Sequence, residues 1–178
     1  MRYNISFIGG IHGVGKSTIC QQICDELKLE YLSASELLKW REVGEDFKNK
    51  KVKNIQATQE QLIIGLRNTL QKDKCYLLDG HYCLLNSEND VINIPIETFK
   101  TIKPISLNLI IGDIDEIKNR LEKRDSMPYN YKLLERMQNS ELSYAEHLSK
   151  TLGVTLSIGT QKNLSEILTS LRKVFSIK

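Results

Sequence analysis

The residues best suited to chemistry lie near the amino terminus, where a glycine-rich stretch runs directly into a predicted helix. Residues 10–17, GIHGVGKS, match the pattern G-x-x-x-x-G-K-[ST] in full. Glycines at these positions let successive backbone N–H groups point inward as an anion-binding nest. Lys16 places a positive charge beside the β- and γ-phosphates, Ser17 offers a hydroxyl to Mg²⁺, and the following helix directs its positive end at the phosphates. We therefore predict that the chain binds a nucleoside triphosphate. The predicted nucleotide-binding residues are Gly10, His12, Gly13, Val14, Gly15, Lys16, Ser17 and Thr18.

A second candidate site lies where an apolar stretch ends in the middle of the chain. Asp79 follows Leu78 there, the place at which an acidic residue holds Mg²⁺ opposite the hydroxyl of a phosphate-binding loop. Because Asp-Gly is also a common turn pair, the alternative is a structural turn. Given the loop upstream, we favour Asp79 as a catalytic residue and, together with Ser17, as a magnesium ligand. His81 follows, and it either contacts substrate or satisfies a buried backbone group.

Two arginines are candidates for stabilising the transferred phosphoryl group. Arg120 and Arg124 are four residues apart late in a predicted helix, so their side chains share a face. Arginines that neutralise the charge on the γ-phosphoryl oxygens promote phosphoryl transfer. The alternative is an ordinary salt-bridged helix end, where basic residues are common. Their place in the chain favours a catalytic role, and Arg120 is also predicted to contact the nucleotide.

Apolar runs that alternate with helical periodicity indicate the elements that position these residues. Because each strand is a continuous apolar run, the pattern predicts one α/β domain over 1–178 with a parallel sheet covered on both faces. A Ser-x-x-Glu capping box, Ser33 to Glu36, is expected to start the helix after the second strand. Asp113 or Asp115 is expected to cap another helix, and Gly153 to end the next. The predicted strands are 3–8, 30–32, 75–78, 105–111 and 154–158, and the predicted helices are 16–28, 36–70, 113–124, 131–152 and one that begins at 163.

Composition excludes several classes of protein. The 178 residues are 40% hydrophobic and 26% charged, with a net charge of +3, which is too mild to indicate a nucleic-acid partner. The apolar runs are far shorter than the roughly 20 residues that span a bilayer, and the amino terminus does not resemble a signal peptide, so a cytoplasmic protein is expected. The sequence leaves the oligomeric state open. The four cysteines, expected to be reduced and partly buried, lack the spacing of a zinc site; they are Cys20, Cys24, Cys75 and Cys83.

With these motifs in place, nearly the whole chain resembles the nucleoside monophosphate kinases, the adenylate-kinase-like group of P-loop proteins, and small AAA-type ATP-binding proteins related to them. The resemblance implies a three-layer α/β/α P-loop NTPase fold with sheet order 2-3-1-4-5. It also implies that region 36–70 holds the acceptor and that Arg120 and Arg124 flank a short lid-like region, 120–136.

The resemblance further implies an acceptor site at the helix after the second strand. Lys39 stands where the family has an arginine, and Arg41 is close by. Residues 79–82, DGHY, replace the Gly-Phe-Pro-Arg pattern with which adenylate kinases read adenine, so that base-reading assignment does not transfer. The predicted substrate residues are Ser35, Lys39, Arg41 and His81.

The leading hypothesis is therefore a small kinase, a phosphotransferase with ATP and Mg²⁺ as cofactors, that phosphorylates a nucleotide or nucleoside-like small molecule. If the acceptor atom is a hydroxyl, Asp79 is the nearest candidate base. The alternative is an ATP-binding, slowly hydrolysing regulator or assembly factor that acts on a protein or RNA. A basic run supports this alternative, although such runs are more often solvated surface; its members are Lys48, Lys50, Lys51 and Lys53. The sequence does not favour a GTPase, because no guanine-reading Asn-Lys-x-Asp motif occurs.

Overall fold

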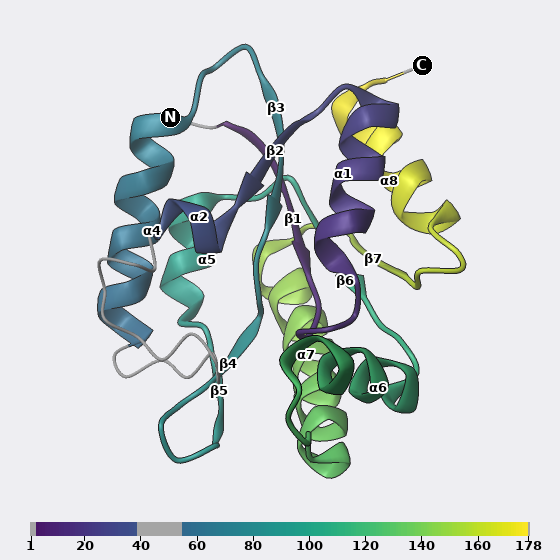
Figure 1. Ribbon diagram of the computed structural model, residues 1–178. Helices are drawn as coiled ribbons and strands as arrows, with labels where there is room; N and C mark the ends of the chain where they lie inside the picture. Colours follow the sequence, from purple (N-terminus) through teal and green to yellow (C-terminus); the bar gives the residue numbers. More distant parts are fainter. Residues whose placement is uncertain (1–2, 39–54, 178) are drawn as a thin grey trace.

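A twisted parallel sheet of five strands forms the centre of the molecule in the computed structural model, which describes residues 3–38 and 55–177 (Figure 1). The strand order is β2-β3-β1-β6-β7. Counted along the chain, these are the second, third, first, fourth and fifth strands of the sheet, so the expected order 2-3-1-4-5 is confirmed. The strands are β1 (Asn4–Gly9), β2 (Glu30–Ser33), β3 (Cys75–Asp79), β6 (Ser106–Ile110) and β7 (Leu156–Gly159).

Helices cover both faces of this sheet and make the three layers that the sequence predicts (Figure 1). One face packs against α1 and α8, and the other against α4, α5 and the carboxyl-terminal half of α7. Strands between two apolar layers are buried on both sides, which explains their continuous apolar runs. The described helices are α1 (Lys16–Leu27), α2 (Ala34–Leu37), α4 (Ile55–Thr69), α5 (Ile96–Ile102), α6 (Ile114–Asp125), α7 (Tyr131–Leu152) and α8 (Ser165–Phe175).

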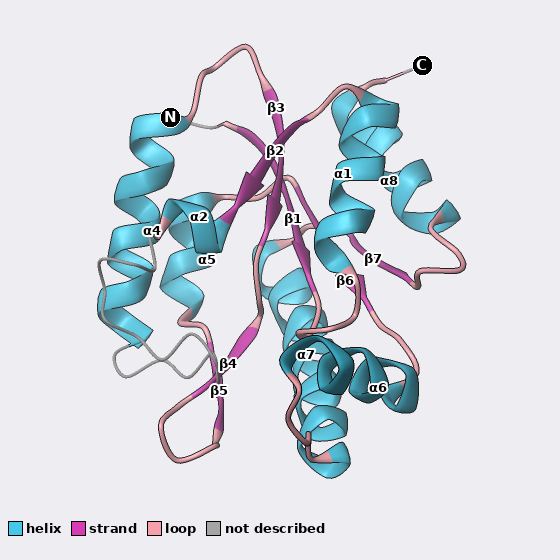
Figure 2. Cartoon of the chain, viewed as in Figure 1, coloured by secondary structure: helices cyan, strands magenta, loops and turns pink. Residues whose placement is uncertain are grey.

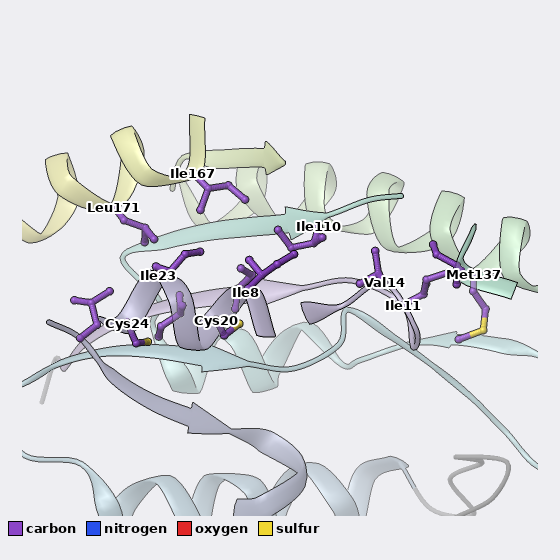
Figure 3. Close-up of a cluster of buried hydrophobic side chains, with 14 of the residues drawn as sticks. Ile8, Ile11, Val14, Cys20, Ile23, Cys24, Ile110, Met137, Ile167 and Leu171 are labelled. Atoms are coloured by element: carbon purple, nitrogen blue, oxygen red, sulfur yellow. The ribbon is translucent and has the colours of Figure 1, made fainter. Parts of the chain in front are cut away.

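The apolar cluster on the α1 and α8 face extends beneath the glycine-rich loop (Figure 3). Ile11 and Val14 belong to that loop, yet each side chain is only 1% exposed and packs in this cluster. Ile8 of β1 and Ile110 of β6 lie in the same cluster. The loop is therefore anchored to the core by its own apolar residues, while Gly13 and Gly15 stay partly exposed.

Local signals predict the ends of some helices. Asp113 caps α6 by accepting a hydrogen bond from the Glu116 N–H (3.0 Å), and Gly153 ends α7 with φ +65°, as expected. The expected helix start at Ser33 is confirmed, since Ser33 is the N-cap residue of α2, but its side chain makes no capping hydrogen bond and its hydroxyl lies 2.8 Å from that of Ser35 instead. The helix that follows, α2, has only four residues.

An antiparallel hairpin of β4 (Cys83–Leu85) and β5 (Val91–Asn93), which was not predicted from the sequence, follows β3 (Figure 2). Its strands have three residues each, too few for a periodic pattern. Its turn is held by Asn86, whose Oδ1 accepts hydrogen bonds from the N–H groups of Glu88 (2.9 Å) and Asp90 (2.8 Å).

Two further observations concern the described residues as a whole. None of their helices combines the length and apolar character needed to cross a membrane. The cysteines are free thiols, and within 3–38 and 55–177 no group of three or more His, Cys, Asp and Glu side chains is arranged to hold a metal ion.

Candidate active site

The glycine-rich loop connects β1 to α1 at the carboxyl edge of the sheet, where ligands collect in open α/β folds. Gly10, Gly13 and Gly15 have φ values of +145°, +80° and +91°, conformations that favour glycine. A Cβ on Gly13 would also lie 2.6 Å from Cγ of Leu121 in α6, so the loop approaches α6 as closely as a bare backbone permits. This gives the loop the form of an anion nest at the start of a helix.

Lys16 and Asp79, predicted from separate motifs, are in contact. The Lys16 ammonium lies 3.2 Å from Asp79 Oδ1, and both side chains are less than 10% exposed. The Ser17 hydroxyl donates to Asp79 Oδ2 at 3.5 Å. The pairing of β1 with β3 places Ile8 opposite Asp79, which brings the acidic residue to the edge of the loop. Ser17 is exposed, so its hydroxyl and the Asp79 carboxylate form a pair of hard oxygen donors that suits Mg²⁺.

Tyr31 is a further residue of this cluster that the sequence analysis missed. Its O–H group donates a hydrogen bond to Asp79 Oδ2 at 3.0 Å from the neighbouring strand β2. Burial, followed by the nearby Asp79 carboxylate, raises the pKa of Tyr31 above its ordinary value, so its hydroxyl keeps its proton. Both oxygens of Asp79 therefore have donors, and the carboxylate is held in place as a fixed negative charge.

A cleft of about 370 Å³, the outer cleft, opens on one side of the loop. Arg120 and Arg124 of α6 line it together with Gln161, which follows β7. A Cβ on Gly15 would lie 1.9 Å from Gln161 Nε2 and 3.4 Å from Arg120 Nη1, so both side chains lie directly on the loop. The cleft is lined by Ile11, His12, Gly13, Gly15, Lys16, Ser17, Thr18, Arg120, Leu121, Arg124 and Gln161.

The two predicted arginines differ in their surroundings. Arg120 Nε donates to the Glu116 carbonyl (3.2 Å), so its terminal nitrogens stay beside the loop. Arg124 is half exposed and donates to both carboxylate oxygens of Asp125 (2.7 and 2.6 Å). The salt-bridged helix end considered from the sequence therefore describes Arg124 better than Arg120.

A second space of about 320 Å³, the inner cavity, opens on the other side of Lys16 and Ser17. Its polar lining includes Ser35 and His81, two of the predicted substrate residues. Lys39 and Arg41, the other two, and the basic run at 48–53 lie outside the described residues. Gln59 of α4, which the sequence analysis missed, is 6% exposed. The cavity is lined by Phe7, His12, Lys16, Ser17, Ser33, Ala34, Ser35, Leu38, Thr58, Gln59, Leu62, Asp79, Gly80, His81, Leu84, Ile94, Thr98, Phe99 and Ile102.

His81 lies in the wall between this cavity and the loop. Its ring centroid is 4.2 Å from that of His12, and its Nδ1 is 3.5 Å from Oε1 of Glu141 in α7. Burial, followed by the charge of Lys16, lowers the pKa of His81 below its ordinary value, although Glu141 and Asp79 oppose the shift. The imidazole is therefore neutral near pH 7.

Glu141 is the site residue that sequence reasoning should have found. The buried positions of α7 include Leu134, Met137, Ala145 and Leu148, and Glu141 falls in the same stripe. A carboxylate in a buried helical stripe requires polar partners, which is a signal of a specific role. Its partners come from a segment about 60 residues away and are not evident from the sequence.

The comparisons with known proteins agree with this geometry. A family model described as an AAA domain matches residues 9–138. The chain belongs to this AAA-domain family. This membership confirms, at the level of a P-loop NTPase, the resemblance noted from the sequence. Among solved structures, a gluconokinase from Sinorhizobium meliloti 1021 is similar over 99% of this chain and 94% of its own, with a TM-score of 0.58 and 13% identity. At that identity the likeness concerns the fold. No curated protein matches the chain.

Proposed function

We propose that the protein is an ATP- and Mg²⁺-dependent kinase that transfers the γ-phosphoryl group of ATP to a nucleotide or nucleoside-like small molecule. One observation carries this proposal: Lys16 and Ser17 line both the outer cleft and the inner cavity. The two spaces therefore lie on either side of the Lys16 ammonium and the Ser17 hydroxyl. A protein that only hydrolyses ATP does not need the second space. Phosphoryl transfer needs a donor and an acceptor in line on either side of the transferred group.

The residues around the loop then have distinct roles. The backbone nest and Lys16 hold the β- and γ-phosphates, and Arg120 faces the charge that spreads over the transferred group. Mg²⁺, when bound by Ser17 and Asp79, adds positive charge beside the same phosphates. An acceptor oxygen attacks the γ-phosphorus from the inner cavity, the bond from that phosphorus to the β–γ bridging oxygen breaks, and ADP is released.

The lining of the inner cavity favours an acceptor with an apolar, flat part and a few hydrogen-bonding groups. Phe7 and Phe99 contribute aromatic surface, whereas Ser35, Thr98 and Gln59 contribute hydroxyl and amide groups. Nucleosides and their monophosphates have this mixed character. The acceptors to test are therefore adenosine, guanosine, cytidine and thymidine, their monophosphates, and gluconate because of the structural neighbour.

The test is to incubate the purified protein with MgATP and each acceptor, and to measure both ADP and the phosphorylated product. The proposal expects ADP formation that depends on one acceptor class and a product of matching mass. The Lys16→Ala variant serves as the control for contaminating kinases. ADP formation that responds only to an added protein or RNA would instead support a regulatory ATPase and would contradict the proposal.

A further inference from the structure

Glu141 is a fully buried carboxylate, 0% exposed, in the middle of the long helix α7. A buried carboxylate lowers stability unless partners compensate for its lost hydration. Its partners therefore indicate why a charged side chain occupies an otherwise apolar helical stripe.

The partners of Glu141 are consecutive residues that follow β3. Its Oε1 accepts hydrogen bonds from the backbone N–H groups of Tyr82 (2.9 Å) and Cys83 (3.1 Å). The same oxygen is 3.5 Å from His81 Nδ1. One oxygen atom of α7 thus holds the turn through which the chain leaves the sheet.

The other side of the turn is fixed by the Tyr82 ring. Its O–H group donates to the Asn108 carbonyl of β6 (2.9 Å), and the side chain is 0% exposed. The ring lies so close to Gly9 that a Cβ there would be 2.3 Å from it. Tyr82 and Glu141 together leave the turn little room to shift.

Residues on both sides of Tyr82 enter the wall of the inner cavity. Gly80, His81 and Leu84 all line it. The carbonyl of Tyr82 also accepts a hydrogen bond from the N–H of Ile94 (2.9 Å), another lining residue. The position of this part of the wall therefore depends on the contact with α7.

The second oxygen of Glu141 lacks such partners in the part of the chain that the structure describes, so the carboxyl group is explained by the contacts of Oε1 and not by packing alone. Oε2 is buried and has no hydrogen-bond partner among the described residues. If packing alone mattered, an apolar side chain of similar size would be expected to serve as well or better.

We propose that Glu141 is a positioning residue that locks the turn at residues 80–83 and thereby holds His81 and its neighbours in the acceptor-facing wall of the inner cavity. This inference rests on the proposed kinase function, because it assigns the inner cavity to the acceptor. It predicts an effect on the acceptor side of the reaction that exceeds any effect on ATP.

The test compares Glu141→Gln, which keeps an oxygen that can accept both N–H groups, with Glu141→Leu, which has similar size and no acceptor. In the Leu variant the amide protons of Tyr82 and Cys83 should lose protection from hydrogen exchange. Its KM for the best acceptor of the panel should rise about tenfold or more, because His81 and its neighbours would no longer be held where they orient the acceptor. Its KM for ATP should stay within about twofold by the same argument. The Gln variant should keep the protection and an acceptor KM near that of the wild type. Glu146→Leu, an exposed position on α7, is the matched control.

Two results would overturn the inference. The first is an unchanged acceptor KM in Glu141→Leu despite lost protection, and the second is an equal rise of both KM values. If the Leu variant does not fold, Glu141→Asp replaces it, because its side chain is one methylene shorter and its oxygens would not reach the turn. Wild-type amide protection and wild-type acceptor KM in that variant would overturn the inference. If the wild-type protein phosphorylates no acceptor of the panel, the proposed function is contradicted instead. The hydrogen exchange of the Tyr82 and Cys83 amides still tests whether Glu141 holds the turn.

Discussion

The ammonium of Lys16 and the carboxylate of Asp79 form a buried ion pair, with 3.2 Å between Nζ and Oδ1, at the centre of the candidate site. In this arrangement each charge is compensated without a nucleotide. If ATP and Mg²⁺ bind as proposed, ATP would compete with Asp79 for the ammonium, and Mg²⁺ would provide the carboxylate with another positive partner.

Lys16→Ala is expected to lower ATP turnover by about 100-fold or more, since a buried positive charge at the transferred group is a major part of catalysis. The fold should persist because Asp79 keeps the Tyr31 hydroxyl as a donor. The rate of ADP formation from MgATP checks the turnover, and circular dichroism checks the fold. Lys100→Ala, a substitution of an exposed lysine in α5, should change neither. Wild-type turnover in the Lys16 variant would contradict the assignment of the glycine-rich loop as the ATP-binding site.

Gly13→Ala is expected to destabilise the protein more than Gly153→Ala. Both glycines have positive φ, +80° and +65°, so alanine at either position carries a backbone penalty of about 1–2 kcal/mol. Only at Gly13 would the new Cβ also meet a neighbour, Leu121 Cγ at 2.6 Å, whereas nothing lies within 4 Å at Gly153. Urea unfolding measures both free energies. Equal losses would mean that the loop does not depend on its contact with α6.

Arg120→Ala should reduce turnover by at least about tenfold, as expected for the loss of one charge donor to the transition state. From the sequence, Arg124→Ala is predicted to have a comparable effect. The structure favours a smaller effect for Arg124, because its guanidinium is bound by Asp125 and half exposed. Steady-state kinetics with saturating MgATP separates the two. Wild-type turnover in both variants would mean that neither arginine has a catalytic role.

The stability of the protein should fall as the pH is lowered below about 6.5, the ordinary pKa of histidine. The pKa of His81 in the folded state is lowered by burial and by Lys16, so acid protonates His81 in the unfolded chain first. The unfolded state then binds more protons, and the free energy of unfolding decreases with falling pH. In His81→Asn this decrease should be smaller. Urea unfolding at pH 7 and pH 5.5 gives the comparison, and parallel losses in both proteins would contradict it.

The thiols of Cys20, Cys24 and Cys83 should be unreactive in the folded protein at neutral pH. Burial raises the pKa of Cys24 and of Cys83 to about 12, and it raises that of Cys20 still further. The thiolate, which is the reactive form, is then scarce. A thiol-specific reagent should therefore modify these residues only when urea is added. Rapid labelling of Cys83 without denaturant would show that the turn beside it opens.

Local signals explain which elements were predictable from the sequence. The ends of α7 follow from residues adjacent to them, Asn130 as the amino-terminal cap and Gly153 at the other end. Asp79 was predictable because a strand end is visible as the end of an apolar run. At Ser33 the helix start was predictable but the capping hydrogen bond was not, because the Ser33 hydroxyl pairs with that of Ser35.

Other parts of the site depend on contacts between distant segments. Tyr31 reaches Asp79 only because β2 lies beside β3, and Gln161 reaches the loop only because β7 lies beside β6. The hydrogen bonds of Glu141 join residues 58 and 59 positions apart. No periodicity within a short window reports such pairings. A charged residue in a buried stripe nevertheless marks where to look for one.

Helix α7 makes two contacts of the same kind about one turn apart. Besides the carboxylate of Glu141 on the turn after β3, the side-chain amide of Gln138 bonds both backbone groups of Gly112, just past β6, at 2.9 and 3.0 Å. Gly112 in turn lies against Val14 of the glycine-rich loop, so one contact adjoins that loop and the other adjoins the wall of the inner cavity. Both contacts lie on one continuous helix of 22 residues. Under the proposed function, the distance between phosphoryl donor and acceptor would therefore change only if α7 itself moved.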